Sequence, residues 1–132
     1  ASLLTNIHWA AIDIRKAIQR TENKVSWPPR PSDLSESAMN VPKELDLFLQ
    51  TLMTGKKQWP DEDCHPRVQR LMKSFAQDLM FGVSTRKLNP PKQILLPYAV
   101  KTLTNNVELI QMLNRCGHGI AYSQLEEINT AL

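Results

Sequence analysis

The sequence predicts a single all-α domain of five to six helices. The chain has 132 residues, of which 42% are hydrophobic and 22% are charged, a composition typical of one soluble domain with its own core. Glycine occurs only four times, and the nine prolines fall mostly between stretches in which apolar residues recur every three or four positions. That spacing places the apolar side chains on one face of a helix.

The first helix is predicted over residues 1–22. Its apolar residues step by three and four and form one stripe: Leu4, Ile7, Ala11, Ile14, Ala17 and Ile18. Residues 23–41 are rich in proline and serine, and the run Trp27-Pro28-Pro29-Arg30-Pro31 favours extended backbone. We therefore expect a proline-rich connector there, followed by a helical core over residues 42–132.

Two helices are expected at the start of this core. The first begins at Pro42, which suits a first helical turn, and stops at Gly55. The second runs from Pro66 to about Phe81, with Gly82 as its terminator. Five of its apolar residues are expected to point inward: Val68, Leu71, Met72, Phe75 and Leu79.

Two more helices follow a proline pair. Asn89 is a plausible cap for the first of them, which contains Pro97, so we expect a kink or a break at that residue. The next helix is capped by Asn105 or Asn106 and ends at Gly117.

A glycine turn separates the last two predicted helices, as in a helix-turn-helix. Ser123 and Glu126 form a capping box for the last helix, which runs to Leu132. Residues 104–132, however, carry one basic residue, Arg115, against three acidic residues, and acidic side chains repel DNA phosphates. We favour a helical hairpin that closes the core or presents an interface over a hairpin that reads DNA.

The basic residues are unevenly distributed along the chain. The net charge is only +3, yet residues 67–101 hold seven basic side chains against a single acid, Asp78. Six of the seven form a candidate nucleic-acid contact: Arg67, Arg70, Lys73, Arg86, Lys87 and Lys92. Clustered basic side chains attract the phosphates of DNA or RNA. The alternative interpretation is an ordinary solvated helix face.

No enzyme or cofactor signature is present: the chain lacks GxGxxG, Walker, HExxH, CxxC and GxSxG motifs. We therefore expect no catalytic residue, no cofactor and no small-molecule substrate. Two thiols and two imidazoles do supply the donor set of a structural zinc ion: Cys64, His65, Cys116 and His118. Because adjacent residues such as Cys64 and His65 cannot easily chelate one ion, we favour free thiols and expect no metal site.

Three further expectations concern membrane contact, location in the cell and the length of the whole protein. No apolar run approaches the ~20 residues that cross a bilayer, so no membrane partner is expected. No address signal is visible, so we expect an intracellular protein, with the nucleus as a candidate location. The chain begins with Ala1 and stops without a polar tail, from which we expect it to be part of a longer protein.

Part of the C-terminal half resembles a segment of long, uncharacterised proteins of animal genomes that look like products of mobile elements. Three runs carry the likeness: Pro90–Gln93, Val100–Ile110 and Leu113–Ser123. That family has no established activity, so the resemblance implies context only: a helical, accessory region of a transposon-derived, multidomain protein. The resemblance favours association with nucleic acid over binding of a small molecule.

These observations lead to two functional hypotheses. In the first, the chain is a non-catalytic interaction module that contacts DNA or RNA through its basic helix face. In the second, it is a module for protein–protein interaction or oligomerisation without nucleic-acid contact. Its surface would then be the first helix, whose apolar stripe can pair with another chain as well as with the core.

Overall fold

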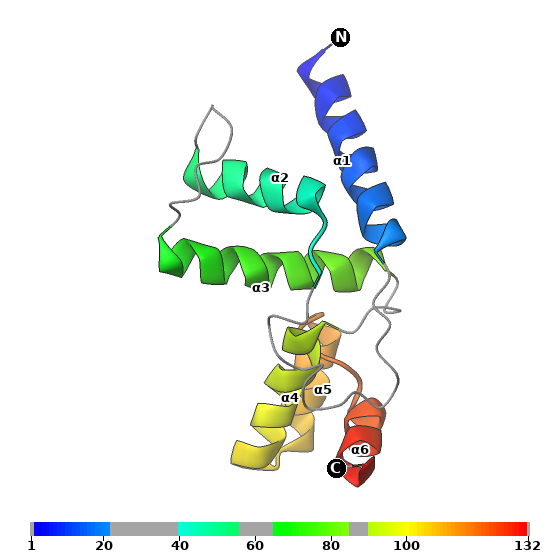
Figure 1. The fold of residues 1–132 in the computed structure, drawn as a ribbon. Coiled ribbons are helices and arrows are strands. Elements are labelled where there is room, and N and C mark those ends of the chain that lie inside the picture. The colour runs from blue at the N-terminus through cyan, green and yellow to red at the C-terminus, as the bar shows by residue number, and fades with distance from the viewer. Residues whose placement is uncertain (1, 22–39, 56–64, 85–89, 132) are drawn as a thin grey trace.

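The computed structural model describes residues 2–21, 40–55, 65–84 and 90–131. Within these ranges the chain forms six α-helices, which confirms the predicted all-α fold. The helices are α1 (Leu3–Arg20), α2 (Lys43–Thr54), α3 (Pro66–Val83), α4 (Pro91–Thr104), α5 (Val107–Arg115) and α6 (Tyr122–Ala131). Figure 1 shows α1, α2 and α3 in one half of the molecule and α4, α5 and α6 in the other.

Several helix ends lie where local sequence signals predict them. The Ser2 hydroxyl caps α1 by accepting a hydrogen bond from the backbone N–H of Thr5 (3.2 Å). Gly55 ends α2 in the left-handed conformation, at φ 69°, which glycine adopts without steric cost. Asn106 caps α5 through its Oδ1 atom, and the backbone N–H of Gly117 donates to the carbonyl of Asn114 beyond the end of that helix.

Helix α3 ends two residues later than predicted, because Gly82 does not terminate it. The helix continues to Val83, and the backbone N–H of Ser84 donates to the carbonyl of Met80 (3.1 Å). Gly82 is not among the glycines with positive φ. Its backbone is therefore compatible with any helical residue, and the lack of a side chain alone does not end a helix.

The start of α6 also differs from the prediction. The helix begins at Tyr122, so Ser123 lies inside it and does not act as its cap. The side chain of Gln124 accepts a hydrogen bond from the backbone N–H of Ala121 (3.3 Å). This is the reciprocal bond of a capping box, made by a residue three positions after Ala121.

Of the predicted kink or break at Pro97, the break does not occur, because α4 is continuous through this residue. Because Pro97 has no N–H, the carbonyl of Gln93, four residues earlier, lacks its helical partner. The backbone N–H of Ile120, from the turn before α6, donates to that carbonyl (2.9 Å). A distant segment thus replaces the bond that the proline removes, and the helix remains continuous.

The apolar core consists of two clusters. The first lies among α1, α2 and α3: Ile18, Leu45, Leu49, Met72, Ala76 and Met80. The second lies among α4, α5, α6 and the turn before α6: Ile94, Ile110, Ile120, Leu125 and Ile128. Val41, at the end of the predicted connector, packs against the first cluster, whereas residues 23–39 lie outside the described residues.

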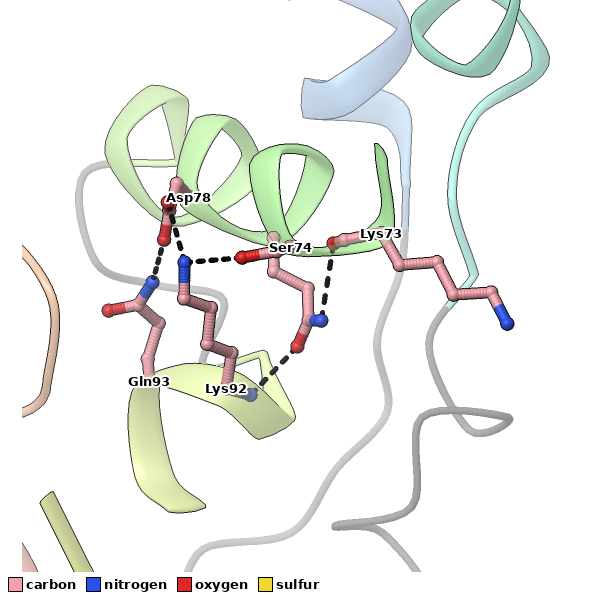
Figure 2. Close-up of polar contacts among 6 residues, drawn as sticks. Lys73, Ser74, Asp78, Lys92 and Gln93 are labelled. Carbon is pink, nitrogen blue, oxygen red and sulfur yellow. Dashed lines mark hydrogen bonds and ion pairs between the residues drawn. The ribbon is translucent and has the colours of Figure 1, made fainter. Parts of the chain in front are cut away.

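A polar contact joins the two halves where α3 meets α4 (Figure 2). The carboxylate of Asp78 accepts hydrogen bonds from Lys92 Nζ (2.8 Å) and from Gln93 Nε2 (2.7 Å). Lys92 Nζ also donates to the hydroxyl of Ser74 (2.7 Å). Gln77 Oε1 accepts from the backbone N–H of Lys92 (2.7 Å), a group at the start of α4 that has no partner within the helix.

Candidate functional site

The six basic residues predicted to contact nucleic acid lie in different places. Three are exposed on the first half of α3: Arg67, Arg70 and Lys73. Lys92 lies in the first turn of α4. Arg86 and Lys87 lie outside the described residues.

The structure brings two of these residues together. Arg70 of α3 and Lys92 of α4 line one surface cavity of about 320 Å³, together with Ser74. The ammonium group of Lys92 is, however, ion-paired with Asp78, and the Lys92 side chain is 23% exposed. Lys92 therefore contributes to the α3–α4 contact, whereas Arg70 faces the cavity from a helix surface that is exposed.

Of the three cations on α3, Arg67 is placed against the helix dipole. The N-terminus of a helix carries a partial positive charge, so a cation there is unfavourable by about 0.3–1 kcal/mol. Arg67 lies in the first turn of α3, and that turn has no acidic residue. Among the described residues, no carboxylate forms an ion pair with Arg67, Arg70 or Lys73. An external anion would be attracted to these three exposed side chains.

A second surface, which we call the apolar face, involves α1, α2 and α3. It is made of Leu3, Leu4, Ile7, Ala10, Ala11, Phe48 and Leu79. Figure 1 shows the N-terminal half of α1 extending away from the rest of the molecule. Leu3, Leu4 and Ile7 are 75%, 77% and 58% exposed, whereas Ile18, at the other end of the same stripe, is buried in the first core cluster.

A groove of about 290 Å³ continues this surface between the three helices. The α1 side of the groove includes Ile7, Ala10 and Ala11. Phe48 of α2 and Leu79 of α3 line its other side. The stripe of α1 predicted from the sequence is therefore one wall of a larger apolar surface, and the contributions of α2 and α3 were not predicted.

The inward face of α3 is a further correction. Leu71, Phe75 and Leu79 were expected inside, but they are 37%, 39% and 41% exposed. Met72 is buried as predicted, and it is joined on the buried side by Ala76 and Met80, with Gln77 and Phe81 buried as well. Both apolar sets recur every four residues, so helical periodicity alone does not distinguish them. The positions of α1 and α2 decide which set is buried.

The four residues weighed as zinc ligands are placed as follows. Nδ1 of His65 accepts a hydrogen bond from the backbone N–H of Arg67 (3.1 Å) and so caps α3. Cys116 and His118 are exposed just after α5. Cys64 lies outside the described residues. Over the described ranges, no group of three or more histidine, cysteine, aspartate or glutamate side chains could hold a metal ion.

The last two helices pack back onto α4. Leu125 and Ile128 of α6 are buried in the second core cluster, and Glu126 forms an ion pair with Lys101 of α4. Hydrogen bonds from Lys101 and from the hydroxyl of Tyr122 lower the pKa of Glu126. This pair of helices thus closes the second core cluster.

Comparison of the chain with protein-family models, with curated proteins and with solved structures finds no match. Over the described ranges, no helix combines the length and the apolar character that a membrane crossing requires.

Proposed function

We propose that the chain is a non-catalytic interaction module whose apolar face binds another protein chain. One observation carries this proposal: the outer half of α1 is both exposed and uncharged. Residues 3–12 include no aspartate, glutamate, lysine or arginine, and Leu3, Leu4 and Ile7 are each more than half exposed. Contiguous apolar surface in contact with water is unfavourable by about 25 cal/mol per Å², and such patches mark interaction sites.

The groove beside α1 supports the same proposal. A helix with apolar residues spaced by three and four can lie in an apolar groove, which is a common mode of peptide and helix recognition. Phe48 and Leu79 provide the second wall that such a helix needs. The described lining of the groove is apolar apart from Arg15, and such a lining suits the binding of an apolar helix.

Photo-crosslinking in cells that express the protein tests this proposal. Benzoylphenylalanine replaces Leu4 on the apolar face in one variant and Leu103 of α4 in the matched control. Leu103 is 84% exposed but lies in the other half of the molecule. We expect a covalent protein adduct from position 4 and not from position 103. Equal labelling at both positions, or none at position 4, would contradict the proposal.

A second candidate function is contact with nucleic acid through Arg67, Arg70 and Lys73. The observation that favours it is the exposure of these three cations on one helix without a carboxylate partner among the described residues. If each residue contacts one phosphate, log Kobs would fall with log salt concentration with a slope of about −3.

Charge reversal tests this second candidate. The variant Arg67→Glu/Arg70→Glu/Lys73→Glu is compared with Arg15→Glu/Lys16→Glu/Arg20→Glu, an equal change in charge at exposed residues of α1. We expect only the α3 variant to lose retention of DNA or RNA, with unchanged helical circular dichroism in both. Equal loss in the two variants would indicate an effect of net charge, and the candidate would be rejected.

A further inference from the structure

We infer that the apolar face is occupied by a second copy of this chain, whose α1 pairs antiparallel with α1 of the first. The inference rests on the proposed protein-interaction function and names its partner. The two helices would be related by a two-fold axis that passes beside Ile7. In such an interface the same surface is used by both copies, so it must be complementary to itself.

The sizes of the exposed side chains on α1 meet this condition. Leu3 and Leu4 precede Ile7 by four and three residues, and Ala10 and Ala11 follow it by three and four. All five lie on one stripe of the helix and are exposed. In an antiparallel pair centred on Ile7, the large Leu4 of each copy faces the small Ala10 of the other. Leu3 faces Ala11 in the same way.

Large side chains opposite small ones are what close packing of two helices requires. The two isoleucines would meet at the axis, and each pair of leucines would enter the groove beside Ala10 and Ala11 of the other copy. Phe48 and Leu79, which line that groove, would then contact the leucines. Binding of an unrelated protein would not explain why large side chains before Ile7 are matched by small side chains at the same distances after it.

The charges of α1 permit this pairing. The stretch from residue 3 to residue 12 carries no formal charge, and Asp13 is the first charged residue of the helix. In the antiparallel register, Asp13 and the basic residues after it lie beyond the N-terminal end of the other α1. Like charges therefore do not face each other along the paired stretch of α1.

The shape of the molecule permits it as well. The N-terminal half of α1 extends away from the other helices (Figure 1), so a second helix can lie along it. In this register the two copies of Ile14 are separated by fourteen residues along the helix axis, which corresponds to about 21 Å. The remaining helices of the two copies therefore lie at opposite ends of the helix pair. Each copy buries only half a helix and one groove. We therefore expect the buried area to lie at the small end of the range for stable interfaces, which centres on ~800 Å² per partner. We therefore expect a reversible, concentration-dependent dimer.

Disulfide trapping tests the register. In a Cys64→Ser/Cys116→Ser background, Ile7→Cys places one thiol beside the two-fold axis, close to the same thiol of the second copy. Leu103→Cys is the matched control, because residue 103 is also exposed but lies on α4. Under mild oxidation we expect Ile7→Cys to form a covalent dimer at least ten times faster than Leu103→Cys. Equal rates would overturn the inference.

A second test exchanges the large and the small side chain between positions 4 and 10. Light scattering should show the mass rising with concentration from 15.1 kDa toward twice that value. Leu4→Ala and Ala10→Leu should each weaken the dimer, whereas the double variant Leu4→Ala/Ala10→Leu restores the large-to-small contact and should recover it. These residues are exposed, so circular dichroism should stay unchanged. A mass of 15.1 kDa at every concentration, or no recovery in the double variant, would contradict the pairing.

The outcomes also separate this inference from the function on which it rests. If the photo-crosslink at position 4 joins two copies of this chain, the inference and the function are both supported. If it captures only a different protein, the interaction function stands and the self-pairing is wrong. If it captures nothing, both are wrong.

Discussion

The ring of Pro97 lies directly against the backbone of Gly119, so that a Cβ atom at residue 119 would be 3.0 Å from Cγ and 3.2 Å from Cδ of the ring. Both residues are buried. The next residue, Ile120, donates its N–H to the carbonyl of Gln93 that Pro97 leaves free. The proline thus makes room for a backbone hydrogen bond from outside the helix, and the glycine allows the two backbones to approach.

Gly119→Ala should therefore destabilise the protein. A rigid, buried proline ring cannot move aside for the new methyl group, and overpacking of this kind costs about 1–3 kcal/mol. Urea unfolding followed by circular dichroism measures the change in the free energy of unfolding. Repeating the substitution in a Pro97→Ala background removes the ring and should reduce the loss. The same loss in both backgrounds would show that the contact with Pro97 is not its cause.

Gly82→Ala should have the opposite effect. Gly82 lies inside α3, it has no positive φ, and a Cβ at this position meets no atom within 4 Å. Alanine restricts the unfolded chain more than glycine does, so the free energy of unfolding should rise by about 0.4–1 kcal/mol. Thermal unfolding of the two proteins under identical conditions measures this change. A lower midpoint for the alanine variant would contradict the structure of α3 at this residue.

Asp78→Ala should destabilise the contact between α3 and α4. The carboxylate accepts hydrogen bonds from Lys92 and Gln93, and hydrogen bonds to charged groups contribute about 1.5–3 kcal/mol. Because both side chains of the ion pair retain some contact with water, we expect a loss near the lower end of that range.

Two further variants control for this change. Asp13→Ala removes an exposed carboxylate from α1 and should alter the free energy of unfolding by about 0.5 kcal/mol or less. Lys92→Ala combined with Asp78→Ala should lose less than the sum of the single changes, because the two side chains share one interaction. Strict additivity would show that they do not interact.

Glu126 should make stability depend on acid pH. Hydrogen bonds from Lys101 and then from Tyr122 lower its pKa in the folded protein. A carboxyl group with a lowered folded-state pKa stabilises the fold above its unfolded-state pKa, and that contribution is lost as the pH falls through the folded-state value. Unfolding in urea at a series of pH values from neutral to acid should show this loss. Glu126→Gln should reduce the pH dependence in that interval, and an unchanged dependence would contradict the assignment.

Local signals predict some of the helix ends, because such an end depends on one or two neighbouring residues. Gly55 and Asn106 act as the sequence predicts, since a cap needs only a side chain or a permitted φ beside the helix. The continuity of α4 through Pro97 could not be predicted, because it depends on an N–H from Ile120 that is distant in the sequence.

The same distinction applies to the two surfaces. Periodicity predicts the stripe on α1, but it does not show that Leu79 of α3 is exposed beside the stripe, since helix packing decides which apolar set is buried. The clustering of charge in the sequence predicts that the basic residues of α3 form a candidate contact surface. It does not reveal that Lys92 is paired with Asp78, because the two residues are brought together only by the crossing of α3 and α4.

The two separate core clusters also determine what a protein that shared only one half of this chain would contain. Residues 90–93, 100–110 and 113–123, on which the expected resemblance to mobile-element-like proteins rests, all fall in the half that contains α4, α5 and α6. That half has its own cluster of buried residues and behaves as a packing unit with a polar contact to α3. Both candidate surfaces lie in the other half. A protein that shares only the second half would inherit a complete core and neither of the surfaces on which the proposed interactions depend.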